Sequence, residues 1–240
     1  MVNLEMQVNK HKQGYYTVTY GHKEAPLDVQ EAVFAANGLD IVSPAQLGFL
    51  RAQGTKDTFK PYSRTNADVF YDDRTNRVVI VPDRAISKQT GIANLVDAHR
   101  QSKEYVIPKN QRDLIYDMVD EMLKKGTAFT ANHGRTNVET SNFGQTELTF
   151  KLFSDKKLGI KAQDYGDFVK GQGRKTQSIF FDSVYYAKSI NGPYQNRLRV
   201  FGPLVCFDVD GNWSLSHYNG AFGVRFEKTI AEGGAKSRKH

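Results

Sequence analysis

The sequence predicts an α+β fold in which two short helices follow a first strand and an antiparallel sheet closes the chain. A β-branched and aromatic run over Tyr15–Tyr20 reads as that strand. Further on, Asp210-Gly211 and Asn219-Gly220 are hairpin signals, since a type I′ turn needs positive φ at both central residues. The segment Arg197–Thr229 around them therefore predicts a three-stranded meander.

Each of the two helices carries its own end signals. Asp28, with an acidic residue three positions on, has the pattern of a capping box, and Asn37-Gly38 is the expected stop. Ser43 and Gln46 form a second capping box, with a proline at the first helical position. Two capped helices are thus predicted before residue 54.

Alternating side chains define the strands of the closing meander. An apolar run around Leu204 and Cys206 predicts the first strand. Trp213–His217 and Phe222–Phe226 each alternate with a period of two, which predicts the second and third strands.

The middle of the chain contains one clear helix and several weaker elements. An apolar stripe predicts a helix over residues 111–124, formed by Leu114, Ile115, Met118, Val119, Met122 and Leu123. Strands are predicted over Val78–Val81, Leu148–Leu152 and Ser178–Phe181, and a weak helix over residues 92–103. Residues 55–76 are polar, with Tyr62, Phe70 and Tyr71 as expected anchors, and irregular structure is predicted over residues 127–145 and 154–175.

Two stretches resemble the C-type-lectin-like fold. Ala32–Leu50 looks like that family's two-helix segment, and Gly211–Phe226 looks like the closing strands of its prokaryotic and phage members, which tend to end in G-[VF]-R. The resemblance implies that the first and last strands pair, here Tyr15–Tyr20 with Gly223–Lys228. It also implies that residues 85–145 are a helical insertion. The family's disulfide cysteines and its calcium-site motifs are missing from this sequence.

Composition limits the class of protein. With 240 residues, 39% hydrophobic and 25% charged, the chain suits a soluble globular protein, predicted as one domain over residues 1–232 with a disordered basic tail over 233–240. No apolar run approaches the ~20 residues of a membrane span. The N-terminus lacks the apolar region of a signal peptide. A cytoplasmic or virion location is therefore expected.

No side-chain pattern predicts an enzyme, a cofactor or a metal site. Cys206, the single cysteine, lies in an apolar strand, where a structural role is expected. His99, His133 and His217 lack ligand-spaced partners, although His133 in its polar loop is the best functional candidate.

Other loop motifs have both a structural and a functional interpretation. The pairs Asp72-Asp73 and Asp164/Asp167 could hold Mg²⁺ or Ca²⁺, but acidic pairs in loops more often form turns. Gly171–Lys175 could cradle a phosphate, but it lacks the spacing of a phosphate-binding loop. The structural interpretation is favoured for each motif.

The leading prediction is a non-enzymatic binding or structural protein that recognises a protein or glycan. Its binding face is expected on late loops rich in aromatic and amide side chains, namely Tyr185, Tyr186, Tyr194, Asn196, Trp213, Tyr218 and Asn219. A viral or mobile-element setting and a homo-oligomer fit this prediction.

The alternative is a nucleic-acid-binding protein. The formal net charge of +7 supports it, together with Arg174, Lys175, Arg197, Arg199 and the basic tail.

Overall fold

The computed structural model describes residues 11–13, 16–53, 62–101, 103–201, 209–211 and 219–228. Its strands form one sheet whose main path runs β1-β2-β12-β4-β10-β11-β9-β8, with β3, β5, β6 and β7 paired off this path. The strands are β1 (His11–Gln13), β2 (Tyr16–Ala25), β3 (Asp40–Ile41), β4 (Tyr62–Asp72), β5 (Arg77–Val81), β6 (Tyr105–Val106), β7 (Phe129–Ala131), β8 (Gly134–Glu139), β9 (Thr176–Phe181), β10 (Tyr194–Phe201), β11 (Val209–Asp210) and β12 (Asn219–Lys228).

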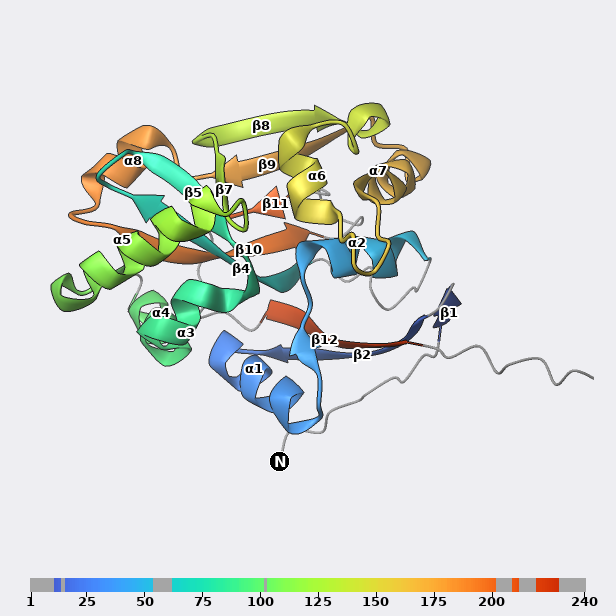
Figure 1. The fold of residues 1–240 in the computed structure, drawn as a ribbon, viewed down its shortest axis with the longest axis horizontal. Helices are drawn as coiled ribbons and strands as arrows, with labels where there is room; N and C mark the ends of the chain where they lie inside the picture. Colours follow the sequence, from blue (N-terminus) through green and yellow to red (C-terminus); the bar gives the residue numbers. More distant parts are fainter. Residues whose placement is uncertain are drawn as a thin grey trace, which may run out of the picture.

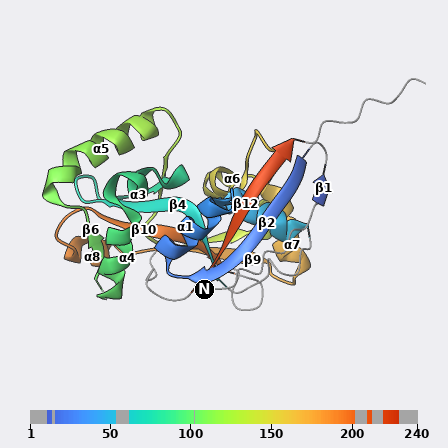
Figure 2. The same cartoon turned by 90° about the horizontal axis from the view of Figure 1, so that it is seen from below.

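Helices gather at two ends of this sheet, as two perpendicular views show (Figures 1 and 2). The helices are α1 (Leu27–Ala36), α2 (Pro44–Ala52), α3 (Ala85–Thr90), α4 (Ile92–Arg100), α5 (Lys109–Lys124), α6 (Glu147–Phe153), α7 (Ala162–Gly171) and α8 (Val184–Ser189). At one end α3, α4, α5 and α8 lie together, and at the other end α2 contacts α6 and α7.

The first and last described long strands are neighbours, which confirms the pairing that the resemblance implies. β2 and β12 pair antiparallel over their full lengths, with Gly21 opposite Gly223 and Tyr16 opposite Lys228. A Cβ atom at Gly223 would lie 2.4 Å from the Phe34 ring, so glycine lets α1 pack directly onto β12.

Most of the sequence signals for the ends of helices α1 and α2 were correct. The Ser43 capping box is present, since its side chain accepts from the Gln46 amide while the Gln46 side chain accepts from the Ser43 amide. Gly38 ends α1 at φ +64°. The prediction for Asp28 was wrong, because the N-cap of α1 is Pro26 and Asp28 lies inside the first turn. A carboxylate there still complements the helix dipole.

No element was predicted over residues 55–76, which contain β4, a strand between β12 and β10 whose polar side chains Arg64, Thr65 and Asp68 are buried. Two predictions of irregular structure were wrong. Residues 127–145, within the predicted insertion, contribute β7 and β8 to the sheet, and residues 154–175 contain α7.

The predicted strand over Leu148–Leu152 is the helix α6. Thr149, Leu152 and Phe153 are buried, whereas Phe150 is 44% exposed. Inward positions thus recur at helical spacing, and the alternation that suggested a strand is coincidental.

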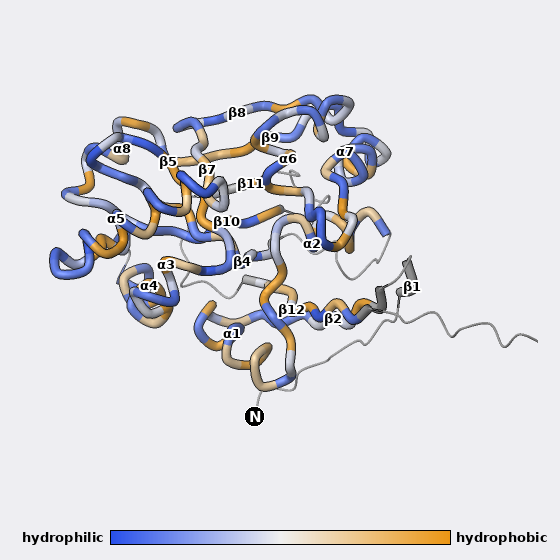
Figure 3. Tube along the Cα trace, in the orientation of Figure 1, coloured by the Kyte–Doolittle hydropathy of each residue, from blue (hydrophilic) through white to orange (hydrophobic). Residues whose placement is uncertain are grey.

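The predicted helix over residues 111–124 is confirmed as α5, and the weak helix over 92–103 as α4. On α5, Ile115 and Val119 are buried, but Leu114 is 58% exposed, so the predicted apolar stripe is wider than the buried one. The strands predicted over Val78–Val81 and Ser178–Phe181 are also confirmed. Figure 3 shows β5, which is apolar after its first residue, Arg77, and β8, at the end of the sheet path, which is mostly hydrophilic.

The closing segment differs from the predicted meander. Its third strand is present as β12, but this strand lies between β2 and β4. The two preceding strands, around Leu204 and Cys206 and over Trp213–His217, fall outside the described residues.

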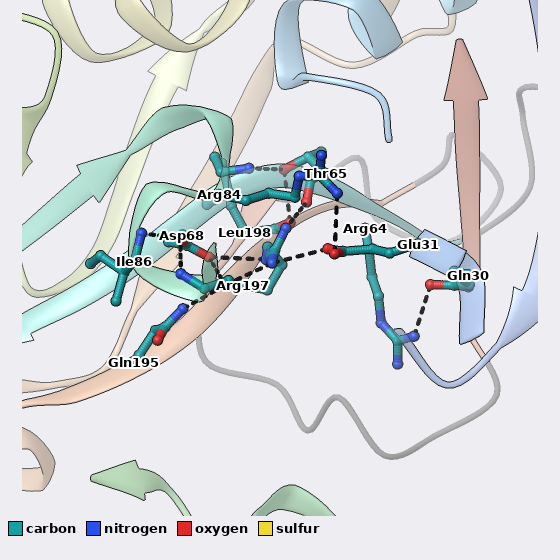
Figure 4. A network of polar contacts seen from close by, with 12 residues as sticks. Gln30, Glu31, Arg64, Thr65, Asp68, Arg84, Ile86, Gln195, Arg197 and Leu198 are labelled. Carbon is teal, nitrogen blue, oxygen red and sulfur yellow. Dashed lines mark hydrogen bonds and ion pairs between the residues drawn. The ribbon is translucent and has the colours of Figure 1, made fainter. Parts of the chain in front are cut away.

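The centre of the sheet contains three fully buried arginines, Arg64 on β4 and Arg197 and Arg199 on β10, and a fourth, Arg51, is fully buried on α2. Figure 4 shows Arg197 inside a polar network. Its guanidinium lies 3.2 Å from Asp68 Oδ1 and 3.2 Å from Glu31 Oε1, and it donates to the Ser87 hydroxyl at 2.8 Å. Two carboxylates therefore compensate this buried charge.

Asp68 also receives hydrogen bonds from main-chain amides. Its Oδ2 accepts from Ile86 N and Ser87 N, both at 3.0 Å, at the start of α3. Arg64 instead donates to the Ala25 carbonyl and the Gln30 side chain, at 3.0 and 3.1 Å. Burial, followed by the nearby Arg199 and Arg197, lowers the pKa of Arg64 to about 9, so it stays charged at neutral pH.

We expect Asp68→Asn to destabilise the protein strongly, because the charge of Arg197 then loses a buried partner. Breaking such a pair costs roughly 3–5 kcal/mol. Urea denaturation measures the difference. Asp120→Asn is the matched control, since its ion pairs with Arg74 and Arg77 are surface contacts with side chains 36–47% exposed. That variant should lose less than about 1 kcal/mol. Equal losses in the two variants would contradict the role of the buried pair.

Candidate functional site

A cavity of about 230 Å³ lies where the β4–β5 turn meets the loop before β8 and the connection from α8 to β10. The turn contributes Tyr71, Asp72, Asp73, Asn76 and Arg77; the loop contributes His133; and the connection contributes Ala187, Lys188, Ile190, Asn191, Gly192 and Tyr194. The predicted face around residues 185–196 therefore supplies one wall of this cavity.

Two tyrosines form a fixed aromatic wall. The rings of Tyr71 and Tyr194 stack with centroids 4.2 Å apart and an interplanar angle of 5°. The Tyr194 hydroxyl donates to Asp182 Oδ2 at 2.9 Å, and the Asp182 amide donates to the Tyr71 hydroxyl at 3.0 Å. Burial, together with the neighbouring Tyr71 and Asp182, raises the pKa of Tyr194, so it remains a neutral donor.

The Asp72 carboxylate holds the β4–β5 turn together. Its carboxylate lies 3.2 Å from Arg74 and 3.3 Å from Arg77 and accepts from the Thr75 hydroxyl at 2.8 Å. Burial would raise the pKa of Asp72, but the hydrogen bonds from Arg74 and Thr75 outweigh it and lower the pKa. Asp73 accepts from the Tyr116 hydroxyl. The turn-forming interpretation therefore holds for this pair.

His133 links the turn to β9. Its Nδ1 lies 2.8 Å from the Asp182 carbonyl oxygen and its Nε2 lies 3.2 Å from the Asn76 carbonyl oxygen. Both ring nitrogens thus face main-chain acceptors, an arrangement that positions the rim of the cavity. Within the described ranges, no group of three or more His, Cys, Asp or Glu side chains is placed to hold a metal ion.

The structure separates the predicted binding residues. Tyr185 and Tyr186 lie on α8 and are 84% and 44% exposed, whereas Tyr194 and Asn196 are buried in β10. The expectation that Tyr194 and Asn196 belong to a binding face on exposed late loops was therefore wrong. Trp213, Tyr218 and the side chain of Asn219 lie outside the described residues.

The nucleic-acid candidates are also separated. Arg174 and Lys175 are exposed between α7 and β9, but Arg197 and Arg199 are fully buried and cannot contact a phosphate backbone. The prediction for these two arginines was wrong, because β10 lies between β4 and β11 in the sheet.

The remaining loop motifs have structural roles. The amides of Gln172, Gly173 and Arg174 all donate to carbonyls of α7, so the glycine run offers no amide cradle for a phosphate. Asp164 and Asp167 lie on α7 rather than in a loop, and Asp167 accepts from the Gln163 side chain.

His99 lies on α4, where its side chain is buried and uncharged at neutral pH. Glu104 Oε2 lies 3.8 Å from its Nε2, a contact that would favour the charged ring. Burial, with the guanidinium groups of Arg199 and Arg64, outweighs that contact and lowers the pKa of His99 from 6.5 to about 4. His217 and Cys206 lie outside the described residues.

Sequence reasoning missed the cavity residues Asn76, Lys188 and Asn191. Asn76 adopts a positive φ of 52°, a conformation that favours asparagine among non-glycine residues. A turn at Asn76 was therefore readable from the sequence, but its contact with His133 was not, because 57 residues separate them.

Comparison with solved structures places this architecture in a known fold. The chain is similar to a protein from Nanoarchaeota described as "Accommodation of massive sequence variation in Nanoarchaeota by the C-type lectin fold", with a TM-score of 0.55 and 15% identity over 92% of this chain and 99% of that one. The protein therefore has a C-type-lectin-like fold of mixed helix and sheet. The sequence matches no family model and no curated protein.

None of the helices in the described part of the chain is long and apolar enough to cross a membrane. The viral setting, the cytoplasmic or virion location and the homo-oligomer stay predictions from the sequence.

We expect Tyr194→Ala to unfold the protein readily, because it removes a buried ring stacked on Tyr71. Such truncations cost roughly 3–5 kcal/mol. Tyr194→Phe keeps the ring and loses only the bond to Asp182, at a cost of about 1–3 kcal/mol. Thermal and urea denaturation of the two variants measure this order. A Tyr194→Ala variant with wild-type stability would show that the ring is not part of the core.

The pKa of His99 predicts an acid-sensitive fold. The folded-state pKa is lowered, so the stabilisation is complete above the unfolded-state pKa of 6.5 and is lost as the pH falls towards 4. At ~1.4 kcal/mol per pKa unit, the loss reaches roughly 3 kcal/mol. His99→Gln should reduce the pH dependence of unfolding between pH 7 and 4. Parallel pH profiles for variant and wild type would contradict this assignment.

Proposed function

We propose that this protein is a non-enzymatic recognition protein that binds a protein or glycan ligand at α8 and the adjoining cavity. The observation that carries the proposal is a rigid aromatic wall beside polar side chains that the fold leaves available. Lys188 and Asn191 are exposed at the rim, and within the described part of the chain no hydrogen bond or ion pair holds either side chain. Fixed rings combined with available polar groups suit recognition.

The titratable side chains of the cavity support recognition rather than catalysis. Asp72 is held by two arginines, Asp73 accepts from Tyr116, and both nitrogens of His133 face main-chain carbonyls. A general base must reach the proton that it removes. These groups are instead engaged in holding the rim.

The size of the cavity favours a macromolecular ligand. A volume of about 230 Å³ is below the ~300–1,000 Å³ of pockets that enclose small molecules. One side chain or one sugar ring would enter it, while the rest of the ligand lies across α8. Tyr185, 84% exposed on that helix, offers contact area at low entropy cost.

The Nanoarchaeota protein supports a division of roles between a stable fold and the exposed residues on it, since its description joins massive sequence variation to a C-type lectin fold. We propose that here too the sheet and its buried arginines provide stability. The exposed residues of α8 can then determine the ligand, because the core does not depend on them.

Glycan-array and displayed-peptide screening would identify the ligand, and Tyr185→Ala would test the site. We expect truncation of this anchor to cost on the order of 2 kcal/mol, about 30-fold in Kd, with an unchanged melting temperature. Phe150→Ala is the matched control, a 44% exposed aromatic on α6 that should leave binding unchanged. Equal loss in both variants would contradict a site at α8. Ligand turnover by the wild-type protein that disappears in His133→Ala would contradict the non-enzymatic assignment.

A further inference from the structure

Strand β8 lies at the end of the sheet path, and within the described ranges it pairs with β9 alone. Figure 1 shows it along the outer edge of the sheet. The side chains of Arg135, Asn137 and Glu139 are exposed, while that of Val138 is buried. We propose that two copies of this protein form a dimer in which their β8 strands pair antiparallel about a two-fold axis at Asn137.

The main chain of β8 has hydrogen-bonding groups on its outer side. In an antiparallel ladder, successive residues direct their N–H and C=O groups alternately towards and away from the partner strand. The Thr140 amide donates to the Lys175 carbonyl at 2.9 Å, so Thr140 and every second residue before it face β9. The Phe180 carbonyl, opposite Arg135, accepts instead from the Gly211 amide next to β11, which agrees with this alternation. The β8 residues whose main-chain groups point away from β9 are therefore Arg135, Asn137 and Glu139.

These outward groups are complementary to themselves in one register. If Asn137 lies opposite Asn137 of a second copy, Arg135 lies opposite Glu139 of that copy, and the two-fold axis repeats the pair. Each outward N–H then meets an outward C=O of the other copy. Main-chain hydrogen bonds and opposite charges thus favour the same alignment.

The charges on β8 oppose other alignments. No ion pair engages Arg135 or Glu139 within the part of the chain that the structure describes, and the Arg135 guanidinium lies 4.3 Å from the centre of the Phe180 ring. Four residues of a strand span ~13 Å, so the two charges of one copy are too far apart to pair with each other. A slip by two residues would place Arg135 opposite Asn137, and parallel pairing would bring like charges together. Charges at a sheet edge normally prevent association, but here they admit a second copy in one register.

The test is sedimentation velocity of the full chain at concentrations up to about 1 mM, the range in which weak interfaces are occupied. The wild-type protein should dimerise reversibly. Arg135→Glu and Glu139→Arg should each weaken the dimer at least tenfold, because each places like charges opposite one another on both sides of the axis. An equimolar mixture of these two variants should dimerise again, since each glutamate of one copy then faces an arginine of the other.

Asn137→Pro tests the main-chain pairing. This change removes an N–H that points away from β9, where an edge strand tolerates proline, so the melting temperature should change little while dimerisation is lost. Asn137→Ala is the matched control. It removes the side-chain hydrogen bond with Ser178 but keeps the main-chain N–H, and it should still dimerise.

The mixing experiment decides the outcome even if the proline variant fails to fold. A wild-type chain that stays monomeric throughout this range, whether or not β8 binds an extended peptide of another protein, would overturn the proposal. So would a dimer that neither charge reversal weakens, or a mixture of the two charge variants that stays monomeric.

Discussion

The ion pair between Arg197 and Asp68 fixes the relation of the two central strands. These residues are direct cross-strand partners of β10 and β4, and both are fully buried. Asp68 also accepts the first amides of α3, and Arg197 reaches Glu31 on α1. One pair of opposite charges therefore joins two strands and two helices. A slip of β4 by one residue against β10 would turn Asp68 to the other face of the sheet and leave the Arg197 guanidinium without this carboxylate.

The cavity of the candidate site depends on that register, because it lies at the turn of the β4–β5 hairpin. Tyr71 in this cavity stacks on Tyr194, its direct partner in β10. The proposed binding cavity at the turn of the hairpin is thus placed by charges buried at the centre of the sheet.

Elements with local signals could be predicted from the sequence, and elements that depend on distant partners could not. The Ser43 capping box and the apolar run in β5 are each contained within a few residues. β4 has no such signal, since its buried Arg64 and Asp68 look like surface residues until their partners are known. The same reason explains the site. Tyr185 and Tyr194 are chemically identical in the sequence, and only the pairing of β10 with β4 buries the second.

The position of β12 has a consequence for synthesis on the ribosome. This strand is the last of the described strands in chain order, yet it lies between β2 and β4. Until β12 emerges from the ribosome, the edge of β2 that later pairs with it remains unpaired. The core that buries Val18 and Tyr20 of β2 is then incomplete. Open strand edges are templates for association with other chains. A nascent chain of this protein therefore exposes an unpaired strand edge, at which it can associate with other chains, until β12 has been synthesised.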